Sequence, residues 1–313
     1  MQVDRSLLRW LDIPVLRTLE GVLTGVHRQR RTGEGMELEE VRAYQPGDEV
    51  RRIEWNSTAR LGEPYVRLPV DERDVTLWLL VDLSPSMAFG TVRQRKCDLA
   101  STLAVSLGYV ALRRGDSLGA MVFSGRERQP HSSDRGRSAR SIPLVLPPAT
   151  TRRQLVQLAA VLSRPPRPIN LTWSAFLQFA QRAMPRRSLV YVISDFLSDD
   201  QWEETVRHLA QRHEVNLVRV VDPREVELPD VGVISVRDAE TGDVAWVDTG
   251  QQAVRAAYHA AAVDRRQRLH TLARGLGIDV LELSTAEPLL EPLLRFQALK
   301  QWRRPCTLPT RSP

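Results

Sequence analysis

Short apolar runs alternate with longer helical patterns from residue 75 onward, and this alternation constrains the fold more than any other feature. The apolar runs are VTLWLLVD (75–82), SLGAMVF (117–123), LVYVIS (189–194), VNLVRVV (215–221) and IDVLEL (278–283). Runs of this kind are typical of strands buried on both faces of a parallel sheet. The helical patterns between them cover residues 92–113, 151–162, 173–184, 201–212 and 251–274. The sequence therefore predicts an α/β fold with an open, mostly parallel, doubly wound sheet.

The first 74 residues have a different pattern. Residues 15–31 predict an amphipathic helix, with Leu16, Leu19, Leu23 and Val26 at helical spacing. Residues 36–74 are short and turn-rich, which predicts strands joined by turns.

This change of pattern predicts the domain organisation. We expect residues 1–74 to form an N-terminal helix and β segment, residues 75–302 the α/β domain, and residues 303–313 a tail. Two stretches rich in Pro, Gly and charge, 124–150 and 223–250, interrupt the alternation. We expect these excursions to pair with the N-terminal strands in a small β subdomain.

The composition indicates a cytoplasmic protein without disulfides. No apolar run approaches the roughly 18 residues that span a bilayer, and charges interrupt the opening MQVDRSLLRWLD, unlike a secretory signal. The two cysteines, Cys97 and Cys306, lie far apart and lack the spacing of metal ligands.

The charge balance is basic, with 44 Lys and Arg against 38 Asp and Glu. Basic charge attracts nucleic acid or acidic partners, but acids are interleaved with the arginines almost everywhere. The densest exception, residues 126–140, contains no aromatic residue to stack on a base. We therefore interpret it as a solvated loop and keep nucleic-acid binding as an alternative.

Oxygen-bearing side chains follow two of the predicted strands. Asp82, Ser84 and Ser86 alternate after the first strand, and Asp195 follows the third. Because ligands of open α/β sheets bind outside the carboxyl ends of the strands, we expect these four side chains to meet. Carboxylate and hydroxyl oxygens suit Mg²⁺, or another hard divalent cation, better than zinc.

A structural explanation competes with this metal site. Ser84 is also suited to cap a helix, with Pro85 at the first helical position. The buried strand before the motif, Met87 after it and the Ser-Asp end of the later strand together favour the metal site.

Two resemblances follow from these residues. Asp82-x-Ser84-x-Ser86-Met87, with Asp195, resembles the metal-ion-dependent adhesion site of von Willebrand factor A domains. From about residue 33 to 302, the chain resembles a bacterial domain-of-unknown-function family, number fifty-eight, which is often associated with MoxR-type AAA+ ATPases. The matching segments are Tyr44-Gln45-Pro46-Gly47-Asp48, Arg51-Arg52-Ile53-Glu54-Trp55, Ala59-Arg60, Gly115-Asp116, Asp222-Pro223 with Glu225, Leu228-Pro229 and Leu283-Ser284-Thr285.

The adhesion-site resemblance also implies a threonine ligand from the loop before residues 173–184. Alignment on that helix puts Leu171 in the threonine's place, and a shift of one residue would bring in Thr172. The segment around Trp55 contains no recognisable catalytic motif, and we interpret it as a turn followed by a strand that buries Trp55.

The sequence favours an interaction module over an enzyme. No histidine shows a recognisable pairing with a nucleophile, no Walker-type loop is present, and Cys97 lies within a helical pattern. The resemblance implies an adaptor that works with a MoxR-type AAA+ ATPase on a client protein. A Mg²⁺-dependent hydrolase that uses a water next to Asp195 remains the second alternative.

Overall fold

The computed structural model describes most of the chain. The described residues are 11–32, 41–44, 53, 55–67, 75–125, 143–164, 171–198 and 201–302. They fall into two compact units, one of residues 21–74 and one of residues 1–20 with 75–313.

The larger unit is built on a six-stranded sheet with the order β10-β7-β6-β3-β4-β5. All neighbouring strands are parallel except β5, which runs antiparallel to β4 at one edge. The strands are β3 (Thr76–Asp82), β4 (Ser117–Phe123), β5 (Leu144–Ala149), β6 (Leu189–Ser194), β7 (Glu214–Val221) and β10 (Asp279–Ser284). The predicted mostly parallel α/β sheet is confirmed, and each of the five predicted strands is found within one residue of its expected ends.

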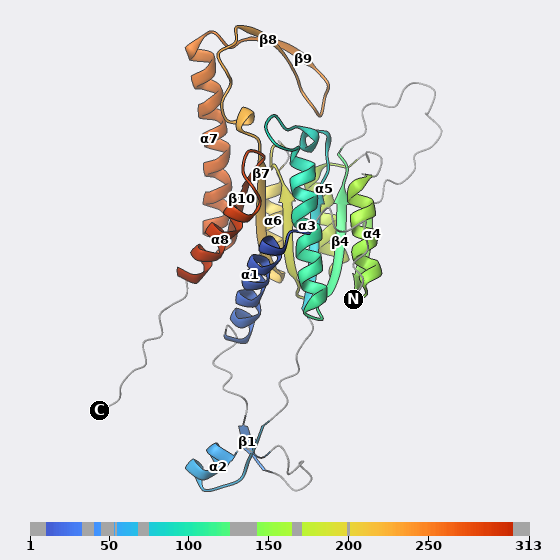
Figure 1. Cartoon of the computed structure of the whole chain (residues 1–313), viewed down its shortest axis with the longest axis vertical. Helices are drawn as coiled ribbons and strands as arrows, with labels where there is room; N and C mark the ends of the chain where they lie inside the picture. Colours follow the sequence, from blue (N-terminus) through green and yellow to red (C-terminus); the bar gives the residue numbers. More distant parts are fainter. Residues whose placement is uncertain are drawn as a thin grey trace, which may run out of the picture. The chain divides into compact units, whose positions relative to one another are not determined.

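Helices cover both faces of this sheet (Figure 1). They are α3 (Lys96–Arg113), α4 (Arg152–Ser163), α5 (Trp173–Ala183), α6 (Trp202–Arg212), α7 (Gln252–Gly275) and α8 (Leu290–Trp302). Helices α5, α6 and the end of α7 share one apolar cluster with alternate residues of the strands, such as Trp78 and Leu80 of β3. Helices α3 and α4 pack on β3, β4 and β5 from the other side.

Close packing at the centre of the sheet depends on a glycine. A Cβ on Gly119 of β4 would lie 2.8 Å from the Trp78 ring. The bare backbone therefore lets the indole lie against the neighbouring strand, where it is 4% exposed.

The described strands of the two excursions pair elsewhere than with the N-terminal strands, so that prediction was wrong. Residues 144–149 form β5 of the main sheet, where Pro147 and Pro148 are tolerated because an edge strand leaves some amides unpaired. Residues of the second excursion form β8 (Val233–Arg237) and β9 (Val244–Asp248), which pair only with each other among the described strands. Both pairings join segments close in sequence, which costs less loop-closure entropy than a pairing with residues 36–74.

The smaller unit contains β1 (Val41–Ala43), which pairs with β2 (Tyr65–Arg67), and the short helix α2 (Trp55–Leu61). The predicted strand that buries Trp55 was wrong, because Trp55 begins α2 and its side chain is 69% exposed. Gly62, with φ of 76°, follows the helix in the left-handed conformation common at helix ends. The matching residues 45–52 and Glu54 lie outside the described part of the chain.

The predicted N-terminal helix is confirmed as α1 (Ile13–Thr32). Its buried side chains include Val15, Leu16 and Leu19, and Glu20 pairs with Arg113 of α3 at 2.9 Å. Among the described residues, no helix combines the length and apolar character needed to cross a membrane.

Candidate functional site

The predicted residues lie at the point where the sheet changes direction. Strands β3 and β6 are neighbours at the centre of the sheet. Strands β4 and β5 follow on the β3 side, and β7 and β10 follow on the β6 side. Ligands of doubly wound sheets bind at such a switch point, outside the carboxyl ends of the strands. Asp82 is the last residue of β3, and Asp195 directly follows β6.

Asp82 is held from both strands. Its Oδ1 accepts a hydrogen bond from the Ser84 amide at 2.9 Å, and its Oδ2 accepts one from the Ser194 hydroxyl at 2.6 Å. The side chain is 4% exposed. The bond from Ser194, at the end of β6, therefore fixes Asp82 on the Asp195 side of the switch point.

Ser84 and Ser86 direct their hydroxyls toward each other across Pro85. The two Oγ atoms lie 3.0 Å apart, at the start of the 3₁₀ turn η3 (Pro85–Ala88). Pro85 does occupy the first helical position, as the structural explanation required, but the Ser84 side chain makes no capping hydrogen bond. Buried Met87 anchors this turn in the core.

A glycine at the end of β4 permits this loop conformation. Gly125 has φ of 81°, and a Cβ there would lie 2.4 Å from Cδ of Pro85. A larger residue would displace the loop that carries both serines.

Asp195 sits on a strained turn. Phe196, the next residue, has φ of 55°, a conformation that bulky residues rarely adopt. Its buried ring packs against Trp202 of α6 with the ring centroids 5.0 Å apart, and its amide donates to Ser194 Oγ. The Leu197 amide donates to Asp195 Oδ1 at 3.1 Å. Packing thus holds a backbone geometry that aims Asp195 at the switch point.

A buried lysine, which the sequence analysis did not identify, completes the cluster. Lys96 begins α3 and is 0% exposed; its Nζ donates to Asp195 at 2.6 Å and to Glu225 at 2.5 Å. Burial alone would lower the pKa of Lys96, but the two carboxylates outweigh it and hold this pKa above its usual value. A signal was present, since the chain has only two lysines among 44 basic residues.

Asp82, by contrast, lacks a positive partner. Burial, reinforced by the negative charge of Asp195, raises the pKa of Asp82 to about 7, despite the hydrogen bonds from Ser194 and Ser84. Within the described residues, no lysine, arginine or histidine forms an ion pair with Asp82. When ionised, the side chains of Asp82, Asp195 and Glu225 therefore carry more negative charge than Lys96 alone balances.

Thr172 has a different role from the other four predicted residues. It is the N-cap of α5, where its exposed hydroxyl accepts a hydrogen bond from the Ala175 amide at 3.2 Å. Leu171 packs against the apolar cluster beneath α5. The structure thus brings together Asp82, Ser84, Ser86 and Asp195, and it shows Thr172 capping a helix.

The donor set fits a hard cation with a small protein contribution. The Asp82 and Asp195 carboxylates lie close enough for their charges to interact, and the Ser84 and Ser86 hydroxyls lie 3.0 Å apart in the loop that follows Asp82. Each carboxylate oxygen that accepts one hydrogen bond keeps a second lone pair for an ion. In the described part of the chain, no three His, Cys, Asp or Glu side chains form a metal-binding group. Asp82, Ser84, Ser86 and Asp195 would therefore hold Mg²⁺ with waters in the remaining positions, and the ion would offer an exchangeable position for an oxygen ligand.

A second buried carboxylate lies nearby, at the end of β7. Asp222 is 0% exposed and accepts hydrogen bonds from Thr91 N at 2.7 Å, Thr91 Oγ1 at 2.6 Å, Thr285 Oγ1 at 2.6 Å and Arg224 N at 2.9 Å. Its own amide donates to Glu225, the partner of Lys96. This Asp222 cluster fixes the loop between η3 and α3 to the far strands. Asp222, Glu225 and Thr285 were matched only by family resemblance, and the structure now gives them a shared role.

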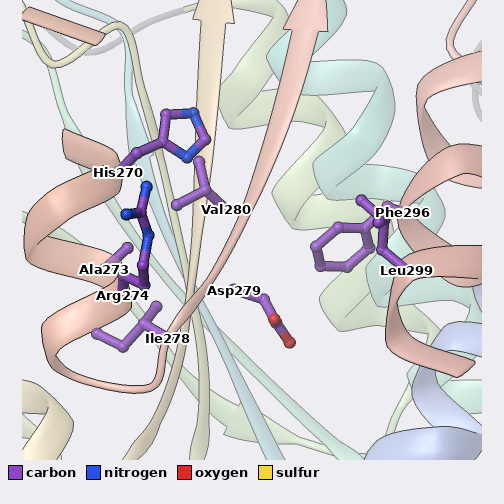
Figure 2. A pocket seen from close by; sticks show the side chains of 8 residues that line it. All are labelled: His270, Ala273, Arg274, Ile278, Asp279, Val280, Phe296 and Leu299. Carbon is purple, nitrogen blue, oxygen red and sulfur yellow. The ribbon is translucent and has the colours of Figure 1, made fainter. Parts of the chain in front are cut away.

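Histidines and the pocket lie apart from this cluster. His208 pairs with Glu204, His259 contacts the Val226 carbonyl, and His270 pairs with Glu282. A pocket of about 210 Å³ lies at the start of β10, between α7 and α8 (Figure 2). Its lining residues are His270, Ala273, Arg274, Ile278, Asp279, Val280, Phe296 and Leu299. It lies at the amino end of its strand, and none of the five predicted site residues lines it.

Comparisons with solved structures give only weak similarity. The protein BatB from Bacteroides thetaiotaomicron matches with a TM-score of 0.40 and 15% identity, over 72% of this chain and 96% of that one. An aerotolerance-related membrane protein from Bacteroides fragilis matches with a TM-score of 0.40 and 16% identity, over 72% and 97%. TM-scores of this size support no conclusion about this chain.

Sequence comparisons are more informative. An uncharacterized protein of Mycobacterium tuberculosis is 35% identical over 298 residues, which covers 94% of this chain and 89% of the relative. An uncharacterized protein of Mycobacterium avium is 32% identical over 142 residues, or 45% of this chain and 83% of the relative. The model of the family described as "Protein of unknown function DUF58" matches residues 40–268. Because this match covers more than half of the sequence, the chain belongs to the DUF58 family.

Proposed function

We propose that this chain is a cation-dependent protein-interaction module. In this proposal Asp82, Ser84, Ser86 and Asp195 hold Mg²⁺, and an acidic side chain of a protein partner completes the coordination. The observation that carries the proposal is that buried Asp82 has no cationic partner among the described residues and lies beside the Ser84 and Ser86 hydroxyls. A cation would stabilise the ionised form of Asp82, and a ligand set of few protein oxygens leaves room for a partner.

The von Willebrand factor A-like character of the fold is part of the same proposal. Its support is the coincidence of three features: the strand order β10-β7-β6-β3-β4-β5, the antiparallel edge strand, and a motif of alternating oxygens at the switch point. A hydrolase is less well supported, because His208, His259 and His270 contact residues outside this cluster, and Lys96, which contacts Asp195, is held in its charged form and cannot accept a proton.

The identity of the partner rests on the family resemblance. We infer that the partner is a MoxR-type AAA+ ATPase, with which the module remodels or matures a client protein in the cytoplasm. The geometry contributes the chemistry of recognition, which is a carboxylate presented to a cation at the Ser84–Ser86 rim.

Binding of Mn²⁺, followed by electron paramagnetic resonance and competed with Mg²⁺, tests the site. We expect wild-type protein to bind one Mn²⁺ per chain, and Asp82→Asn to weaken this binding at least about tenfold, or about 1.4 kcal/mol. The Asn side chain keeps a similar shape and an acceptor for the Ser84 amide, so we expect the variant to fold. Asp279→Asn is the matched control, because it removes a carboxylate at the opposite end of the sheet.

Two outcomes test the cation site and its role in partner binding separately. Equal Mn²⁺ affinity in wild-type protein and Asp82→Asn would refute the cation site. If Asp82→Asn loses the cation but still co-purifies with the MoxR-type ATPase at the wild-type level, the cation does not mediate that partnership.

A further inference from the structure

The β8–β9 hairpin carries an acidic side chain to the proposed cation site. Its turn, residues 238–243, is built around Asp238, whose carboxylate accepts hydrogen bonds from the amides of Glu240 at 2.7 Å and Thr241 at 3.0 Å. Asp238 and Asp243 close the turn with a backbone hydrogen bond of 2.8 Å. Glu240 is therefore presented at the tip of a defined turn.

Glu240 reaches the serine motif itself. Its Oε1 accepts a hydrogen bond from the Ser86 amide at 3.2 Å, across 154 positions of sequence. Ser86 Oγ, on the same residue, faces Ser84 Oγ. The Glu240 carboxylate also lies close enough to Asp195 for their charges to repel. An acidic side chain of this chain thus occupies the rim where an acidic side chain of a partner would bind.

The same excursion is also tied to the site at its base. Glu225 lies near its start and pairs with Lys96, which in turn holds Asp195. At the hairpin's own base, the buried Thr249 hydroxyl donates to the Gly232 carbonyl, and Arg255 of α7 donates to the Thr249 carbonyl at 2.5 Å. The base is therefore firmly fixed.

Little apolar burial holds the hairpin between these two ends. Val233, Val244 and Trp246 are 62%, 51% and 75% exposed, and they share one face of the ribbon. A two-stranded ribbon without a buried face gains little stability from packing. The polar contact at Glu240 therefore contributes substantially to the position of the tip, which Figure 1 shows arching over the carboxyl edge of the sheet.

In the structure Glu240 binds the Ser86 amide and does not yet form a metal-binding group with Asp82 and Asp195. We propose that Glu240 becomes an internal ligand of the cation site when the ion binds, and that it holds the place of the partner's acidic side chain until the partner displaces it. This inference rests on the proposed function. It makes the β8–β9 hairpin an autoinhibitory arm, fixed at Thr249 and released at Glu240. If the arm is closed nine times in ten, it weakens the apparent affinity for a competing carboxylate about tenfold.

Chemical rescue with acetate tests this role. Glu240→Ala removes the carboxylate from an exposed turn, and Asp243→Ala is the matched control, because Asp243 joins the turn through its backbone. We expect Glu240→Ala to raise the Kd for Mn²⁺ about tenfold and acetate to restore it to nearly the wild-type value. Wild-type protein and Asp243→Ala should show no response to acetate, since Glu240 already fills the position.

Hydrogen exchange of the Ser86 amide supplies a readout that needs no ion. We expect this amide to exchange at least about fivefold faster in Glu240→Ala than in wild-type protein or Asp243→Ala, because its acceptor is gone. Unchanged exchange, or Mn²⁺ binding in Glu240→Ala that equals wild type with and without acetate, would overturn the inference. Failure of wild-type protein itself to bind Mn²⁺ would instead overturn the proposed function beneath it.

Discussion

Two buried aspartates at the same edge of one sheet have opposite electrostatic states. Asp82 ends β3 and Asp222 follows β7, and each is bonded to hydroxyl groups and backbone amides. The pKa of Asp82 is raised to about 7, whereas the pKa of Asp222 lies below its usual value. Burial raises both, and more strongly for Asp82, and the neighbours add to the difference.

The neighbours of Asp222 are all donors. Two threonine hydroxyls and two amides point at its carboxylate, and together they outweigh the cost of burial. Asp82 instead faces a second carboxylate, Asp195, whose own lysine also pairs with Glu225. The sign of the neighbouring charge therefore distinguishes a structural aspartate from a candidate metal ligand better than the number of hydrogen bonds does.

Replacement of Lys96 should lower the free energy of unfolding more than any other change considered for this cluster. In Lys96→Met the carboxylates of Asp195 and Glu225 lose their buried counter-charge, and we expect the free energy of unfolding to fall by about 3–5 kcal/mol. Urea denaturation without divalent cations measures this change. Arg95→Met is the control, since its exposed pair with Asp98 should contribute less than about 1 kcal/mol. An equal decrease in the free energy of unfolding of the two variants would mean that Lys96 does not stabilise the buried Asp195 carboxylate.

Paired Asn variants test the two aspartates directly. In Asp222→Asn an NH₂ group replaces one of the two carboxylate oxygens that accept hydrogen bonds from four donors. Some of these donors then lose their acceptor, so we expect a loss of about 2–3 kcal/mol in the free energy of unfolding. In Asp82→Asn the repulsion with Asp195 disappears, so we expect no loss in the free energy of unfolding of metal-free protein at pH 7. The comparison would break if Asp82→Asn proved as destabilising as Asp222→Asn in urea denaturation.

The sheet was predictable from sequence because its strands are buried on both faces. Continuous apolar runs such as 117–123 are short and bounded by turn residues, which favours a buried strand over a buried helix, and their strand ends were placed within one residue. Edge and surface elements gave weaker signals. Strand β5 contains two prolines, and its pairing with β4 depends on the rest of the sheet being present.

The candidate site was predictable only where its residues are close in sequence or end a strand. Asp82, Ser84, Ser86 and Asp195 meet because parallel strands end at one edge. Lys96 and Glu225 lie 129 positions apart and Ser86 and Glu240 lie 154 apart, so only the tertiary fold reveals these pairs. The start of α3 illustrates the difficulty. The helical pattern predicted residue 92, but the Asp222 cluster holds Thr91 in a loop and the helix begins at Lys96.

The contrast between the two aspartates also extends to the pH dependence of stability. A carboxylate with a lowered folded pKa stabilises the fold above its unfolded pKa of about 3.8, and this stabilisation is lost as the pH falls through the folded value. The stability advantage of wild-type protein over Asp222→Asn should therefore be constant from pH 7 to about pH 4 and shrink below that.

Asp82 should behave in the opposite way in metal-free protein. Its folded pKa of about 7 exceeds the unfolded value, so stability relative to Asp82→Asn should decrease as the pH rises from about 4 to about 7. Urea midpoints of both Asn variants and wild-type protein, measured with a chelator between pH 3 and pH 8, give the two slopes. Slopes of the same sign would contradict the contrast between the two aspartates, and with it the argument that only Asp82 needs a cation.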